Sequence, residues 1–261
     1  MSDEYRREVV KRFPHYKKRQ WLVGSKGSTN VLCIHGRPVD SSLMRPFQAW
    51  SVQNSYGCYL YNQFSYKEDT QFCPGSEELL LLLVEELWFH LCHLRDEHLI
   101  IIAHSFGAVL LCEVLQRYDL AQGRVKVVLS GFCPERKEFL KVNQQRLDNF
   151  AMHANSAGAD ELFFDSYICN KSSLAEDQIV AIKRPPLGDI TLRESYLELL
   201  GKLRCPVLVT YGDNDICTDY QAEKIRSRLI NCRVVKITGA AHFPFLEQSR
   251  DYFQALDEFL M

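Results

Sequence analysis

The stretch HLIIIAHSFGAVLL, residues 98–111, constrains the fold of this 261-residue chain more than any other part of it. Mostly apolar residues lead into Ser105, and a second apolar series follows the serine directly. A buried strand followed after a sharp turn by a buried helix accounts for both halves of this pattern. The hydroxyl of Ser105 therefore lies at a seam between strand and helix, which makes it the first candidate for a functional side chain.

Short strand-like runs alternate with longer helical patterns along much of the chain. The strand-like runs are QWLVGS, NVLCIHG, YGCYLYN, HLIIIAHS, RVKVVLSGF, CPVLVTYGD and CRVVKITGAAHF. Helical patterns cover residues 76–93, residues 106–118, TDYQAEKIRSRL and the final LEQSRDYFQALDEFLM. The alternation predicts an α/β fold with a mostly parallel central sheet flanked by helices. Only KGST separates the first two runs, which favours an antiparallel hairpin there.

The alternation stops between residues 133 and 204, where the sequence is typical of helices and loops. The strands on either side need each other for pairing, so we expect a helical insertion between two late strands of one sheet. The predicted organisation is a core of residues 1–132 and 205–261 with a helical cap of residues 133–204.

Composition excludes several classes of function. A net charge of -2 and a pI near 6.5 remove the electrostatic argument for nucleic-acid binding. The first residues lack the features of a secretory signal, and the run LLLLLVEELWFHL is shorter than the ~20 residues of a membrane span. We therefore expect a cytoplasmic protein without a transmembrane segment, in which the basic residues between positions 5 and 19 form a solvated face rather than a membrane contact.

Cysteine and histidine patterns give little support to a metal site. The ten cysteines are scattered without a C-x-x-C pair, so we expect reduced thiols that serve packing. His90, Cys92, His93 and His98 form one cluster, but a helix C-terminus, where histidine suits the helix dipole, explains it better than a metal.

The seam around Ser105 reads AHSFG and resembles the nucleophile elbow of the α/β-hydrolase family. Ala103 and Gly107 supply the small residues that such a turn needs. The family order is serine, acid, histidine, and the resemblance continues in YGDND and GAAHFPFLEQ. It implies Ser105 as nucleophile, Asp215 as the acid with Asp213 in reserve, and His242 as the base.

The segment HGRP resembles the family's H-G-x-P motif, which implies that the backbone amides of Arg37 and Phe106 form the oxyanion hole. We expect the Arg37 side chain to point into solvent, with contact to an anionic substrate as the alternative. His35 and His104 are expected to support loops. The following stretch YNQFSYKEDTQF departs from the family pattern, which weakens any inference about the substrate by analogy.

Aromatic residues near and within the predicted cap are candidates for the wall of a substrate pocket. They could equally attach the cap helices to the core. The candidates are Phe132, Phe139, Phe163, Phe164 and Tyr167.

The resemblance implies a serine hydrolase that cleaves a small ester, thioester or related acyl substrate through an acyl-enzyme, without a metal or organic cofactor. Two alternatives stay open. One is a non-catalytic ligand-binding protein or receptor on the same fold. The other is a hydrolase of C–C bonds in a diketone-like acid, which uses the same three residues.

Overall fold

The computed structural model describes residues 11, 22–23, 28–37, 39–64, 76–94, 98–120, 123–153, 167–169, 171–176, 178–179 and 190–261. The chain forms two compact units, Met1–Lys126 with Pro186–Thr191 and Val127–Pro185 with Leu192–Met261. The division into core and cap stays a prediction.

Four strands belong to the first unit: β1 (Leu22–Val23), β2 (Thr29–Ile34), β3 (Gly57–Leu60) and β4 (His98–His104), in the order β1-β3-β2-β4. β2 is parallel to both β3 and β4, whereas β1 is antiparallel to β3. The prediction of an antiparallel hairpin between the first two strands is therefore wrong, because β1 pairs with β3, the strand after β2, and not with β2 itself. β2 and β4 are almost entirely buried, as expected for parallel strands covered by helices.

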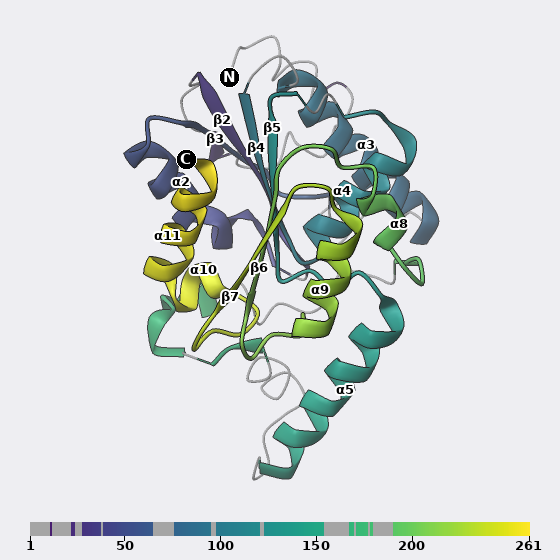
Figure 1. Cartoon of the computed structure of the whole chain (residues 1–261), viewed down its shortest axis with the longest axis vertical. Helices are drawn as coiled ribbons and strands as arrows, with labels where there is room; N and C mark the ends of the chain where they lie inside the picture. Colours follow the sequence, from purple (N-terminus) through teal and green to yellow (C-terminus); the bar gives the residue numbers. More distant parts are fainter. Residues whose placement is uncertain are drawn as a thin grey trace. The chain divides into compact units, whose positions relative to one another are not determined.

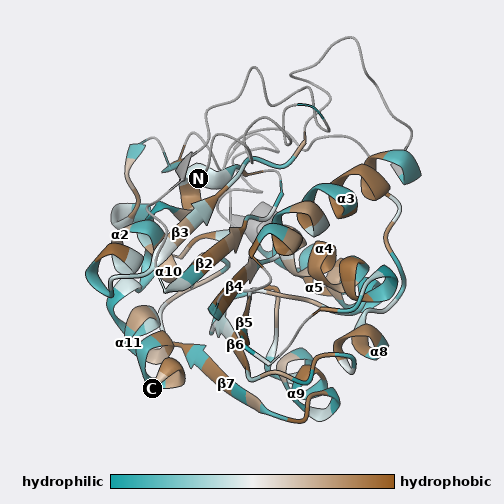
Figure 2. Cartoon of the chain, turned by 90° about the horizontal axis from the view of Figure 1, so that it is seen from above, coloured by the Kyte–Doolittle hydropathy of each residue, from teal (hydrophilic) through white to brown (hydrophobic). Residues whose placement is uncertain are grey.

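The helices of the first unit are η2 (Ser41–Met44), α2 (Arg45–Gln53), α3 (Ser76–Leu94) and α4 (Phe106–Arg117). α3 and α4 pack against each other, and hydrophobic residues run along β4 and α4 in Figure 2. The predicted helices at 76–93 and 106–118 are confirmed within one residue at each end. η2 and α2 had not been predicted; the side chain of Asp40 caps the start of η2 by accepting from the Ser42 amide at 2.9 Å.

The second unit is built around β5 (Val125–Ser130), which enters it at Val127, β6 (Val207–Gly212) and β7 (Cys232–Ile237). These strands are parallel and lie in that order (Figure 1). Every residue of β6 is buried. α9 (Asp219–Arg228) follows β6 and begins with a capping box between Thr218 and Gln221. α10 (Pro244–Glu247) and α11 (Ser249–Leu260) end the chain, and α11 buries Tyr252, Ala255 and Leu256.

The described residues between β5 and β6 contain α5 (Arg136–His153), η3 (Lys171–Ser173) and α8 (Leu197–Leu200). The one bridge described there pairs Glu135 with Ser195. The described part of residues 133–204 therefore matches the expectation of helices and loops without a core strand.

Parallel strands alternating with helices confirm the predicted α/β fold class. Within the described residues, no helix has both the length and the apolar character that crossing a membrane requires.

Candidate active site

Ser105 occupies the turn between β4 and α4, as the sequence predicted. β4 ends at His104 and α4 begins at Phe106, so a single residue makes the turn. Its backbone has φ +52° and ψ -117°, a conformation that is unusual for a residue with a side chain. Such strain costs about 1–3 kcal/mol and accumulates at functional positions.

Position 107, just after this turn, has no room for a side chain. A Cβ atom at position 107 would overlap the carbonyl oxygen of Ile34 and come within 2.8 Å of its carbonyl carbon. α4 therefore approaches the end of β2 so closely that only glycine fits.

The Arg37 side chain does not point freely into solvent, which corrects that expectation. It is half-buried, and its Nη2 donates a hydrogen bond to the backbone oxygen of Phe64 at 3.0 Å. The guanidinium carbon lies 5.1 Å from the centroid of the Phe106 ring, within the range of a cation–π contact. The side chain thus packs on the residue that follows Ser105.

His35 supports the loop after β2, as predicted. Its Nε2 accepts from the Gln63 amide at 3.1 Å, its Nδ1 lies 2.7 Å from the Gly36 oxygen, and the Gln63 side chain donates to the His35 oxygen at 2.6 Å. Burial lowers the pKa of His35 to about 4, so the ring is neutral and can both donate and accept. Gln63 belongs to the stretch YNQFSYKEDTQF, which departs from the family pattern. This stretch therefore holds the loop that carries Arg37 through hydrogen bonds. Sequence reasoning missed this role of Gln63. His104 is buried, and its supporting role stays a prediction.

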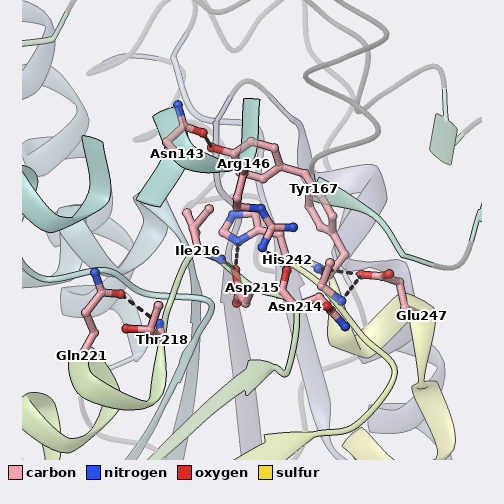
Figure 3. A network of polar contacts seen from close by, with 12 residues as sticks. Asn143, Arg146, Tyr167, Asn214, Asp215, Ile216, Thr218, Gln221, His242 and Glu247 are labelled. Atoms are coloured by element: carbon pink, nitrogen blue, oxygen red, sulfur yellow. Dashed lines mark hydrogen bonds and ion pairs between the residues drawn. The ribbon is translucent and has the colours of Figure 1, made fainter. Parts of the chain in front are cut away.

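Asp215 and His242 form a buried pair in the second unit (Figure 3). The Nδ1 of His242 lies 2.8 Å from the Oδ1 of Asp215, and the same oxygen accepts from the Ile216 amide at 2.6 Å. Both residues are about 5% exposed or less. Asp213, the reserve candidate, instead accepts from the Gly239 amide at 3.0 Å on the surface. Ser105 belongs to the first unit, so the assembly of all three side chains into one triad stays a prediction.

Gly131 borders this pair, and the sequence had not singled it out. It has φ +59°, and a Cβ atom there would lie 3.1 Å from the imidazole of His242 and 3.2 Å from Oδ2 of Asp215. The residue after β5 is therefore suited to glycine for two reasons, its backbone conformation and the tight space beside Asp215 and His242.

The predicted pocket residues lie in different surroundings. Phe132 is buried with its ring 6.4 Å from that of Tyr196, and Phe139 is half-buried on α5. The ring of Tyr167 meets that of His242 edge to face at 5.1 Å. Phe163 and Phe164 lie outside the described residues.

Comparison with known proteins identifies the family of this chain. The model of a family described as the alpha/beta hydrolase family matches residues 31–255. The chain belongs to the α/β hydrolase family. The predicted family resemblance is thereby confirmed.

Individual relatives of this α/β hydrolase carry different names. It is 32% identical over 65 residues to a proline iminopeptidase of Lactobacillus crispatus (strain ST1), a match that spans 25% of this chain and only 22% of that protein. A proline iminopeptidase of Clostridioides difficile (strain 630) is 21% identical over 95% of this chain and 96% of its own length. The crystal structure of a bromoperoxidase from Bacillus anthracis superposes with a TM-score of 0.70 at 19% identity, over 92% of this chain and 94% of that one. That likeness shows the fold alone.

The described residues of this α/β hydrolase contain no cluster of His, Cys, Asp and Glu that could hold a metal. All cysteines that the structure describes are free thiols. Burial raises the pKa of Cys133 to about 12, so this thiol stays protonated at neutral pH and behaves as a packing residue.

We expect two buried histidines to make the hydrolase less stable in mild acid. Burial lowers the pKa of His35 and of His90 from 6.5 to about 4, so between these values the unfolded chain binds protons that the folded chain does not. Stability therefore falls as the pH drops from 6.5 to 4, by about 3 kcal/mol for each histidine. Urea unfolding of the His90→Phe variant, whose ring can replace the packing on Tyr61, should show a shallower loss over this range. The variant His98→Gln, at an exposed position, is the control. An unchanged slope in His90→Phe would contradict the prediction.

Proposed function

We propose that this α/β hydrolase is a serine hydrolase that cleaves an ester, thioester or related acyl substrate through an acyl-enzyme. The observation that carries the proposal is the backbone of Ser105, held at φ +52° between β4 and α4. Strain of this kind costs stability and is maintained where a side chain must be presented for chemistry. The buried pair of Asp215 and His242 supplies the base that a serine hydroxyl requires.

The proposed reaction has two stages. His242 takes the proton from the Ser105 hydroxyl as the oxygen attacks the substrate carbonyl, and then gives that proton to the leaving group as the acyl-enzyme forms. Water then attacks the acyl group, with His242 again as base, and the acid is released with Ser105 restored. Asp215 holds the imidazole through Nδ1 and stabilises its charged form. The amides of Phe106 and Arg37 would stabilise the oxyanion.

The cap of residues 133–204 and the aromatic residues Phe132, Phe139, Phe163, Phe164 and Tyr167 are the proposed surroundings of the acyl group. A second candidate substrate class is a peptide with an N-terminal proline. The observation that favours it is the alignment with the proline iminopeptidase of C. difficile, which covers 95% of this chain.

Labelling with a fluorophosphonate probe tests the proposal. The native protein should react, and the variants Ser105→Ala and His242→Ala should lose labelling while staying folded. A panel of p-nitrophenyl esters of increasing chain length, with proline p-nitroanilide beside it, then separates the two substrate classes. Folded native protein that does not react at any tolerated probe concentration would overturn the proposal in favour of a ligand-binding protein.

A further inference from the structure

Tyr167 contacts His242 through both its backbone and its ring (Figure 3). The Tyr167 carbonyl accepts the His242 amide hydrogen at 3.1 Å, and the two rings meet at an angle of 79° with centroids 5.1 Å apart. Tyr167 comes from the chain between β5 and β6, and His242 from the loop between β7 and α10. A residue remote in sequence therefore fixes the backbone and touches the side chain of the proposed base.

The carboxylate of Glu247 also joins the segment around Tyr167 to the His242 loop by hydrogen bonds. Its Oε1 accepts from the amides on either side of His242, Ala241 at 3.0 Å and Phe243 at 3.2 Å. Its Oε2 accepts from the Cys169 amide at 2.7 Å. Because Glu247 is 3% exposed, these bonds form away from water. The segment 167–169 and the His242 loop are consequently joined both directly and through Glu247.

The phenol of Tyr167 continues the connection to α5. Its hydroxyl donates to Oδ1 of Asn143 at 2.9 Å, and burial raises the pKa of Tyr167 so that the hydroxyl keeps its proton. On the same helix, the Arg146 side chain donates to the backbone oxygen of Asn214, the residue before Asp215. α5 is thus bonded to the loop that carries Asp215 and, through Tyr167, to His242.

The imidazole needs such a second restraint. The bond from Nδ1 to Asp215 fixes one atom of the ring, but it leaves rotation about the line between the two atoms. Tyr167 and Phe243 both meet the imidazole edge to face, at 5.1 and 5.2 Å, and together they limit this rotation. A displacement of about 1 Å at a reacting group can cost about 100-fold in rate.

We propose that Tyr167 is a positioning residue for His242, and that its hydrogen bond to Asn143 makes the orientation of the imidazole depend on α5. This inference rests on the proposed function, in which His242 is the base. In this role the ring of Tyr167 restrains the imidazole of His242, in addition to its predicted place in the wall of a substrate pocket.

The test measures inactivation by a fluorophosphonate, resolved into the affinity of the reversible complex and the rate constant of bond formation. Tyr167→Ala should lower the rate constant about 10- to 100-fold with little change in affinity. Tyr167→Phe and Asn143→Ala each break the same hydrogen bond, worth about 1 kcal/mol, and should each lower it about fivefold. Their combination should lower it no further, because the bond is already lost in either single variant. Gln144→Ala, which removes an exposed contact with Asp148 on the same helix, should react like the native protein.

The outcomes separate the two proposals. Native protein that labels, with Tyr167→Ala and Asn143→Ala reacting at the native rate, would overturn the role of Tyr167 and leave the proposed function standing. Additive losses in the double variant would also overturn it, since they would show separate effects. Native protein that does not label would overturn the proposed function and this inference together. If Tyr167→Ala fails to fold, the three variants that break the hydrogen bond decide the question.

Discussion

Asp215→Asn should lower kcat on an activated ester by about 10³- to 10⁴-fold while the protein stays folded. Oδ1 of Asp215 accepts two bonds, from Nδ1 of His242 and from the Ile216 amide, in a site that is almost closed to water. An asparagine that places its NH₂ group at this position presents a donor to His242 and to the Ile216 amide, so the imidazole must carry its proton on Nε2, where it cannot accept the proton of Ser105. An asparagine that places its oxygen there keeps both contacts. In either orientation the charge that stabilises the imidazolium is lost.

Asp213→Asn is the matched control for this prediction. Asp213 lies two residues away in the same loop, is exposed, and accepts from the Gly239 amide and the Asn214 side chain. Its replacement should change kcat by less than about threefold, since exposed hydrogen bonds contribute little. The comparison requires kcat, the rate of fluorophosphonate labelling and the melting temperature of both variants. Equal losses in the two variants, or a larger loss in Asp213→Asn, would remove Asp215 from the proposed mechanism.

The parts of the fold that the sequence predicted are those with a local signal. Ser105 was found because the apolar pattern changes at the residue where β4 gives way to α4. The stretch from Gly212 to Asp215 matches the G-x-x-D pattern in which the family commonly places its acid, which favours Asp215 over Asp213. This signal is also local, and the contact of Asp215 with His242 agrees with it. Such signals survive in a single sequence because a strand end or a turn dictates them within a few residues.

Other features could not be predicted because they depend on pairs of residues far apart in the chain. The choice of β3 as the partner of β1, 38 residues away in the pairing of Leu22 with Leu60, has no signal near either strand. The contact of Tyr167 with His242 and that of Gln63 with His35 are likewise decided by packing. The solvent position expected for Arg37 failed for this reason, because the Phe64 oxygen and the Phe106 ring hold the guanidinium. The sequence around Gly131 likewise does not indicate that this residue borders Asp215 and His242.

Gly107→Ala should destabilise the protein by about 3 kcal/mol or more and abolish fluorophosphonate labelling. Alanine favours a helix over glycine by about 1 kcal/mol, so propensity alone predicts a gain in stability. The new Cβ atom, however, would overlap the carbonyl oxygen of Ile34 and lie 3.0 Å from that of His35. Both are backbone atoms of the strand end and its loop, which cannot rotate away as a side chain can. α4 must therefore move away from β2, and Ser105, at the start of α4, moves with it.

Gly123→Ala is the control that isolates the steric effect of the Cβ atom in Gly107→Ala on the free energy of unfolding. A Cβ atom at position 123 would have no heavy atom within 4 Å, so this variant should stay within about 0.5 kcal/mol of the native free energy of unfolding. Any small gain would come from the reduced flexibility of the unfolded chain, which the substitution at position 107 shares. Urea unfolding of the two variants therefore gives, by difference, the free energy of the close approach between α4 and β2. If both variants unfold at the same urea concentration and react with the probe at the same rate, the tight turn does not require glycine at position 107.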